Sequence, residues 1–183
     1  MDSNITLARI GTRDSDFEPC MRLMNKSFVD DELRDRDDLM AIVESNPIFG
    51  FNVIRDSGQR VGLITTWNFG KFIYVEHFAI EPEFRGGGVG SRTLAKLSSS
   101  ASLPIVLEVE PPSQSDEAQR RIAFYGRMGF SCWQTEYKQP AYAKGKRTIP
   151  MILMAKDLEE TADASKIVTA ILYRHVYKVK QAL

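Results

Sequence analysis

The sequence predicts a mixed α/β or α+β fold without internal repeats. Three apolar stretches separated by short turns indicate an antiparallel meander in the first half of the chain. A glycine-rich loop then leads from the last of these stretches into a helical segment. Beyond it, strand-like and helix-like patterns alternate. The 183 residues suit one domain with a sizeable core.

The first half of the chain is expected to begin with a strand and two helices. The strand lies near Ile5 to Ile10, and mixed apolar and charged spacing indicates helices at Phe17 to Phe28 and at Asp31 to Glu44. The meander strands that follow are Ile48 to Ile54, Val61 to Trp67 and Phe72 to Ile80.

The second half is expected to alternate helices and strands. These elements are a helix at Gly88 to Ser99, a strand at Ile105 to Glu110, a helix at Ser115 to Met128, and strands at Phe130 to Thr135 and Thr148 to Ala155. The segment Asp157 to Leu183 is expected to be a terminal amphipathic helix. Its apolar stripe is Ile167, Ile171, His175 and Val179, backed by Val168, Leu172 and Val176.

Charge and cysteine content narrow the functional classes. Lys plus Arg equals Asp plus Glu at 24 each, so we expect neither a nucleic-acid partner nor a membrane surface held by bulk charge. The two cysteines, Cys20 and Cys132, have no metal-ligand spacing, and no metal is expected. The few cysteines and the absence of a signal-peptide pattern predict a reduced, cytoplasmic setting.

The glycine-rich run, Arg85 to Ser91, is the most informative local feature. Glycines let backbone amides converge without Cβ obstruction, and a helix that starts here adds the positive end of its dipole. A pyrophosphate is therefore favoured, and Arg85 could add a bidentate phosphate contact. The spacing matches neither a Walker loop nor Gly-x-Gly-x-x-Gly. A plain glycine turn is the alternative.

Three stretches resemble the GNAT superfamily of acyl-CoA-dependent N-acyltransferases. Arg-x-x-Gly-x-Gly at 85–90 is similar to the family's cofactor motif. His77 to Arg85 resembles the family's fourth strand and its exit, and Ala123 to Phe130 resembles its helix ending in Tyr-x-x-x-Gly-Phe. The resemblance covers about residues 4–156. Residues 1–156 would form the acetyltransferase domain, with 157–183 as an amphipathic helical extension.

The resemblance implies acetyl-CoA as the acyl donor and a mostly antiparallel sheet flanked by helices. The fourth and fifth strands would splay apart, and the pantetheine arm would pair with backbone groups between them. Acetyl transfer would go directly to a primary amine in a ternary complex. The implied cofactor-binding residues are Phe78, Ala79, Ile80, Arg85, Gly86, Gly87, Gly88, Val89, Gly90, Ser91 and Tyr125.

Acetyl transfer needs a base for the amine and an acid for the leaving thiolate. Tyr125 occupies the family's motif tyrosine and is the expected acid, with a hydrogen-bonded core aromatic as the alternative. Glu76 shares a strand face with Phe78 and is the expected base, with a structural carboxylate as the alternative. Glu108 and Glu110 are rival bases.

Glu108 and Glu110 also share one face of the fifth strand, where a carboxylate pair could bind a cationic acceptor. In the basic segment Tyr137 to Arg147, Gln139 and Tyr142 are candidate substrate-lining residues, although a solvated loop is expected for its basic side chains. His77 is expected to be a packed, hydrogen-bonded core histidine.

One departure from the family pattern keeps other functions open. Many members carry Asn seven residues before the motif tyrosine, where this chain has Ala118. A small-molecule amine acceptor is favoured over a protein or peptide amine. The alternatives are a non-catalytic acyl-CoA sensor or interaction module and an unrelated phosphate-binding domain. The terminal helix could pack on its own domain or on a second subunit, so a homodimer is left open.

Overall fold

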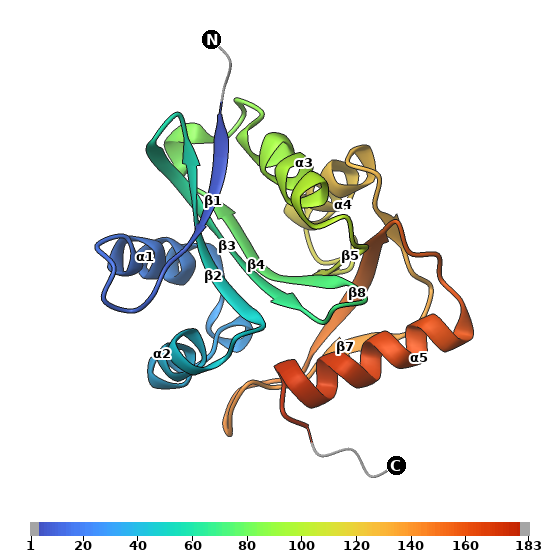
Figure 1. The fold of residues 1–183 in the computed structure, drawn as a ribbon. Coiled ribbons are helices and arrows are strands. Elements are labelled where there is room, and N and C mark those ends of the chain that lie inside the picture. The colour runs from blue at the N-terminus through green and yellow to red at the C-terminus, as the bar shows by residue number, and fades with distance from the viewer. Residues whose placement is uncertain (1–3, 180–183) are drawn as a thin grey trace. The chain divides into compact units, whose positions relative to one another are not determined.

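A computed structural model describes residues 4–179 (Figure 1). Two compact units make up this part of the chain. The first unit comprises residues 4–29 and 36–105. The second comprises residues 30–35 and 106–179, so a short segment from early in the chain belongs to the later unit. The domain boundary expected at residue 157 stays a prediction.

The first unit contains four antiparallel strands in the spatial order β1-β2-β3-β4. They are β1 (Ile5–Arg9), β2 (Phe49–Asp56), β3 (Gln59–Asn68) and β4 (Ile73–Ile80). Ser57 and Gly58 both have left-handed backbones, with φ of 51° and 87°, between β2 and β3. Two such residues make the turn that matches strand twist in a tight hairpin. The predicted meander is therefore confirmed.

Three α-helices belong to the first unit: α1 (Phe17–Ser27), α2 (Arg36–Ser45) and α3 (Val89–Ala101). Figure 1 shows α1 and α2 on one face of the four strands and α3 on the other. The buried side chains of α1 recur every three or four residues, which places them on one stripe facing the sheet. They are Phe17, Cys20, Met21, Leu23 and Met24.

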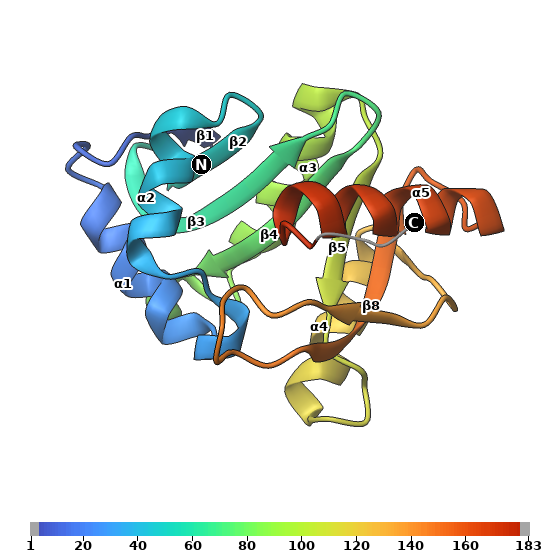
Figure 2. The same ribbon diagram turned by 90° about the horizontal axis from the view of Figure 1, so that it is seen from below.

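In the second unit, β8 (Ile149–Lys156) lies between β5 (Ile105–Val109) and β6 (Ser131–Cys132) and also pairs with β7 (Tyr137–Gln139). Two α-helices, α4 (Asp116–Arg127) and α5 (Ala162–Ile171), begin at hydroxyl caps. The Ser115 and Thr161 hydroxyls accept backbone N–H groups three residues on, which satisfies amides that have no partner within a helix. A π-helical turn, Leu172–Val176, continues α5 (Figure 2).

The helix expected from Asp31 to Glu44 begins later than predicted. A 3-10 turn occupies Asp30–Glu32, and α2 starts only at Arg36. Carbonyl groups at the start of this segment accept hydrogen bonds from the Lys146 and Gln139 side chains. These distant side chains satisfy backbone groups that a continuous helix would have used.

The strand expected over Phe130 to Thr135 is mostly wrong, because only Ser131–Cys132 forms β6. The Trp133 amide still donates to the Leu153 carbonyl of β8 at 2.8 Å. The amides of Gln134 and Thr135 donate instead to the Glu160 carboxylate at 2.7 and 2.8 Å. The prediction also missed β7, which lies in the segment treated as a loop. With three residues, β7 is too short to show an alternating pattern.

The terminal helix is shorter than expected, and its two apolar rows differ in burial. The backing row of Val168, Leu172 and Val176 is buried, with exposed fractions of 2% or less. In the row predicted as the stripe, Ile167 is 53% exposed and His175 is exposed. Helical structure ends at Val176, and residues 180–183 lie outside the described residues.

Candidate active site

The glycine loop of the first unit leaves β4 and enters α3. Gly86 and Gly88 have left-handed φ values of 81° and 74°, and Gly88 is the residue immediately before α3. The amide of Arg92 donates to the Gly88 carbonyl at 3.1 Å, as the helical ladder begins. The amides at the start of a helix have no intrahelical partner and attract anions. The loop is exposed, and the binding of a pyrophosphate to it stays a prediction.

Two arginines hold this loop in different ways. Arg85 Nε donates to the Ile80 carbonyl at 2.9 Å, and the side chain is otherwise exposed. Arg92 Nη1 donates to the Gly87 carbonyl at 2.8 Å, while Nη2 pairs with Asp56 at 2.7 Å. Sequence reasoning missed Arg92, although its position four residues after Gly88 would place it above the loop on the first helical turn.

The end of β4 carries the three residues expected to pair with pantetheine. Phe78, Ala79 and Ile80 are paired on one side with β3, and the Phe78 and Ile80 side chains are half-buried. Gly62 on β3 approaches closely, because a Cβ there would lie 2.4 Å from the Ala79 carbonyl oxygen. The fit of pantetheine along β4 stays a prediction.

Glu76 sits at an irregularity in β4. Thr65 pairs with His77 and Thr66 with Val75, so Glu76 is the additional residue of a β-bulge. Its carboxylate accepts a hydrogen bond from the Trp67 indole at 2.9 Å and is half-buried. Bulges commonly reorient side chains at functional sites. This placement is compatible with the expected base and with a structural carboxylate.

His77 is a packed core residue, as expected. It is 4% exposed, its Nδ1 lies 3.2 Å from Thr65 Oγ1, and the ring of Phe28 meets it edge-on at 4.8 Å. The histidine therefore contributes to packing between β4, β3 and the end of α1.

Tyr125 lies near the end of α4, in the second unit. The side chain is 8% exposed and packs against Phe130 at 5.6 Å between ring centroids. Burial raises the pKa of the phenol to about 12, with Arg121 opposing and Glu110 adding to this shift. Within residues 4–179 the hydroxyl has no hydrogen-bond partner. The phenol is therefore protonated at neutral pH, and its proton is not committed to another described group.

Ala118 stands on the first turn of α4, where many family members carry Asn. It is fully buried, and its N–H donates to the capping Ser115 hydroxyl at 3.1 Å. A methyl group offers no hydrogen bond, so any cofactor contact at this position would have to come from the backbone.

The two carboxylates expected to act as a pair have different partners. Glu110 forms an ion pair with Arg121 at 2.7 Å. Glu108 instead accepts hydrogen bonds from the hydroxyls of Tyr137 and Tyr177. Hydrogen bonds donated to a carboxylate stabilise its charged form. The roles expected for Glu108 and Glu110 stay predictions.

The predicted substrate-lining residues also have structural contacts. Gln139 is 4% exposed and donates to the Asp31 carbonyl at 3.0 Å. The ring of Tyr142 lies 5.0 Å from that of Tyr177, and the Arg34 guanidinium lies 4.6 Å from its centroid. Sequence reasoning missed Tyr177 and Arg34, because no local pattern connects them to Tyr142.

In the basic segment, Lys138, Lys144 and Arg147 are exposed as expected, whereas the Lys146 side chain is only 9% exposed. Lys146 Nζ donates to the Leu33 carbonyl at 2.7 Å and lies 3.2 Å from an Asp30 carboxylate oxygen. Arg147 pairs with Asp31 through its backbone amide and its guanidinium, at 2.8 and 2.7 Å. These two cations hold the 30–35 segment.

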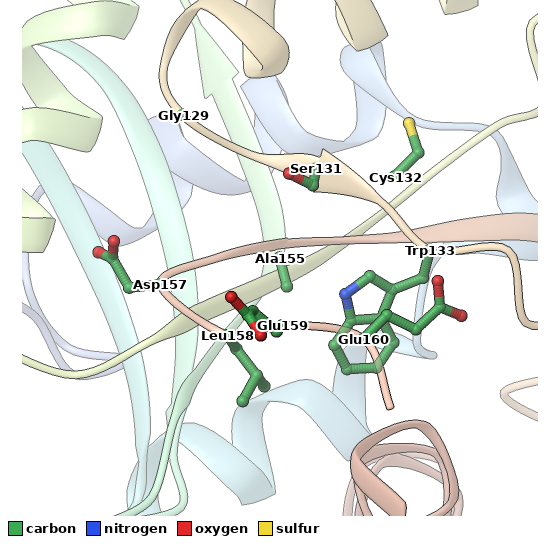
Figure 3. Close-up of a pocket in the computed structure, with 9 residues that line it drawn as sticks. All are labelled: Gly129, Ser131, Cys132, Trp133, Ala155, Asp157, Leu158, Glu159 and Glu160. Atoms are coloured by element: carbon green, nitrogen blue, oxygen red, sulfur yellow. The ribbon is translucent and has the colours of Figure 1, made fainter. Parts of the chain in front are cut away.

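The second unit also contains a cavity of about 490 Å³ (Figure 3). None of the predicted site residues lines it. Glu160, on its wall, is used structurally, since it accepts the amides of Gln134 and Thr135. The lining residues are Gly129, Ser131, Cys132, Trp133, Ala155, Asp157, Leu158, Glu159 and Glu160.

Residues 4–179 contain neither a metal-binding cluster nor a membrane-spanning helix. In this part of the chain no group of three or more His, Cys, Asp or Glu side chains is arranged to hold a metal ion. Among the same residues, no helix has the length and apolarity needed to cross a membrane.

The elements and motifs described above define a GNAT-type acyltransferase, and comparison with known proteins agrees. The family model described as an acetyltransferase (GNAT) domain matches residues 47–132. A solved Bacteroides thetaiotaomicron protein, assigned to the GNAT family of acetyltransferases, is 38% identical with a TM-score of 0.91. That match covers 96% of this chain and 99% of the other. The chain belongs to the GNAT family, whose activity class is acyl-CoA-dependent N-acetylation.

Two further proteins are similar at lower identity. YjbC of Bacillus subtilis, named as an acetyltransferase, is 28% identical over 117 residues, or 63% of this chain. This chain matches only about half of YjbC, 53% of its length. Naa50 of Arabidopsis thaliana, solved with a CoA bisubstrate analogue, is 18% identical with a TM-score of 0.55. That match covers 84% of this chain and 99% of the other, and it shows a shared fold.

Proposed function

We propose that this protein transfers the acetyl group of acetyl-CoA directly to a primary amine of a small molecule, in a ternary complex. The observation that carries the proposal is Tyr125, a buried phenol whose hydroxyl has no partner within residues 4–179. It occupies the tyrosine position of the motif by which the chain resembles its family. A protonated phenol there can donate its proton to a departing sulfur.

The glycine loop supports acetyl-CoA as the donor. Gly86 and Gly88 have left-handed backbones, and the start of α3 offers amides to an anion, so these residues fit a pyrophosphate. Arg85 would add charge, Arg92 would hold the loop in place, and the backbone of residues 78–80 would pair with the pantetheine amides. The bound thioester supplies the activated acyl group.

Two side chains of this protein would accept and donate the protons of the reaction. Glu76 would accept a proton from the acceptor amine, directly or through water, as the new C–N bond forms. Tyr125 would donate its proton to sulfur as the C–S bond breaks. The carboxylate of Glu108, held by tyrosine hydroxyls, would remain charged and bind the acceptor rather than act as base.

The test is free-thiol release from acetyl-CoA across amines, polyamines, amino acids, aminoglycosides and peptides, with acetyl-CoA affinity measured by calorimetry. We expect release that depends on a small amine. Release only with peptides would identify a protein or peptide acceptor. Glu76→Gln should lower turnover, whereas Glu117→Gln, on the exposed surface of α4, is the matched control.

A second candidate is an acyl-CoA sensor that binds the cofactor without turnover. Ala118 favours it, because this chain lacks the side-chain amide that many family members have at that position. Tight acetyl-CoA binding without thiol release for any amine would support the sensor. The homodimer and the cytoplasmic location stay predictions.

A further inference from the structure

Glu108 is held by two tyrosines that come from distant parts of the second unit. Tyr137 donates its hydroxyl to Glu108 Oε1 at 2.6 Å. Tyr177 lies 2.9 Å from Oε1 and 3.1 Å from Oε2, so it contacts both carboxylate oxygens. The orientation of Glu108 therefore depends on a residue 69 positions further along the chain.

The segment that carries Tyr177 is firmly attached within the second unit. Leu172 and Val176 are completely buried, and Tyr177 is 6% exposed. Arg34 Nη2 donates to the Val176 carbonyl at 2.8 Å, one residue before Tyr177. The π-helical turn Leu172–Val176 precedes the tyrosine, and such turns occur often at functional sites. Tyr177 is thus a fixed part of the Glu108 environment.

One aromatic face of this cluster already holds a cation, which comes from the chain itself. The Tyr142 ring packs 5.0 Å from the Tyr177 ring. The guanidinium of Arg34 lies 4.6 Å from the Tyr142 centroid, within the range of a cation–π interaction. Aromatic faces beside a carboxylate are the surroundings in which proteins bind organic ammonium groups.

A cation held at Glu108 would not be the amine that reacts. Nucleophilic attack needs a neutral amine, whereas a carboxylate stabilised as an anion keeps a bound ammonium protonated. An acceptor that uses Glu108 would therefore carry a second positive charge besides its reacting nitrogen.

We infer that Glu108, Tyr137, Tyr142 and Tyr177, here called the tyrosine box, recognise the distal ammonium group of a dicationic acceptor such as a diamine. This inference rests on the proposed acetyl transfer and specifies its substrate class. Tyr177 is a positioning residue, since it acts through Glu108. The helical extension after β8 is accordingly part of acceptor recognition.

The experiment compares linear diamines of about three to five carbons with monoamines of equal chain length. Steady-state thiol release gives kcat and KM, and calorimetry without acetyl-CoA gives acceptor binding. We expect the best diamine to exceed its monoamine in kcat/KM by roughly tenfold or more, as for a hydrogen-bonded charged contact. Equal kcat/KM for both series would overturn the inference.

Tyr177→Phe keeps the ring and removes the hydroxyl that holds Glu108. It should raise the diamine KM by about tenfold and lower the ratio of diamine to monoamine kcat/KM by a similar factor. Glu108→Gln should abolish the diamine preference. Tyr173→Phe is the matched control, because its hydroxyl donates to the Lys138 carbonyl at an exposed position. A full diamine preference in both Tyr177→Phe and Glu108→Gln, with unchanged melting temperatures, would contradict the tyrosine box.

Calorimetry distinguishes failure of the proposed transferase activity from failure of the tyrosine box. If the protein binds diamines through Glu108 but no amine releases thiol, the proposed transferase is wrong and the tyrosine box stands. If monoamines release thiol as efficiently as diamines and Glu108→Gln changes nothing, the transferase stands and the tyrosine box is wrong.

Discussion

The two units carry their candidate functional groups in different ways. In the first unit they lie in one continuous stretch from Glu76 to Arg92, which runs along β4 and through the glycine loop. In the second unit they come from separated segments, with Glu108 on β5, Tyr125 on α4 and Tyr177 after α5. The first arrangement depends on local backbone conformation, and the second depends on tertiary packing.

This difference predicts where a single substitution acts. A change in the glycine loop should affect cofactor binding, because the loop's backbone amides are proposed to bind the cofactor. A change in the second unit should affect turnover or acceptor choice, because there the side chains are proposed to act.

Tyr125→Phe is expected to have the largest effect. Removing the hydroxyl removes the proposed acid, so kcat should fall by about 100-fold while acetyl-CoA affinity changes little. Turnover is measured by thiol release and affinity by calorimetry. Because the pKa of this phenol is raised to about 12, ionisation of Tyr125 should not reduce wild-type turnover between pH 7 and about 10. Wild-type turnover in the Phe variant would remove Tyr125 from the mechanism.

Gly88→Val should reduce acetyl-CoA affinity by roughly tenfold or more. Gly88 has φ of 74°, and its Cβ would meet Arg92 Nη1 at 3.2 Å, so both the loop and its anchor would shift. Gly70→Val is the matched control, since Gly70 has φ of 75° and open space around it. Equal calorimetric affinities for the two variants would argue against the glycine loop as the pyrophosphate-binding site.

The two units also differ in how accessible their cysteine thiols are, and we expect this difference to have a smaller effect. Cys20, on α1, is completely buried, and burial raises the pKa of its thiol to about 12. Cys132, on β6, is only partly buried, and burial raises its thiol pKa as well. A colorimetric thiol reagent at pH 8 should modify Cys132 in the folded protein and Cys20 only after unfolding. Cys132→Ser should abolish the native reaction, and a persistent native signal would place Cys20 within reach of solvent.

Asp31→Asn should have the smallest effect. Arg147, through its backbone amide and then its side chain, holds the pKa of the Asp31 carboxyl below its usual value. A lowered pKa in the folded state contributes stability above the unfolded-state pKa, and this contribution is lost as pH falls through the folded-state value. The variant should melt about a degree lower at pH 7, with the difference shrinking below about pH 4. Asp37→Asn is the control, and a pH-independent difference would contradict the assignment.

Features formed by neighbouring residues were predicted from the sequence better than features formed by residues far apart in the chain. The meander, the glycine loop and α4 depend on turns, glycines and apolar periodicity that neighbouring residues encode. The core position of His77 followed from its apolar strand. The cofactor-binding and catalytic assignments on these elements stay predictions.

Several features that sequence reasoning missed depend on distant contacts. The bonds from Lys146 to the 30–35 segment replace a helical turn, and Glu160 captures the amides that would have extended β6. The contact between Tyr177 and Glu108 has no local signal at all. No pattern within a window of neighbouring residues reports such pairings.

The most direct test of the central claim follows a ¹³C-labelled acetyl group from acetyl-CoA. The protein is incubated with and without a diamine, and intact-protein mass spectrometry and carbon NMR locate the label. Direct transfer predicts label on the acceptor nitrogen only when the diamine is present, with none on the protein. Label attached to the protein, or label that stays on CoA with every amine tested, would contradict the account.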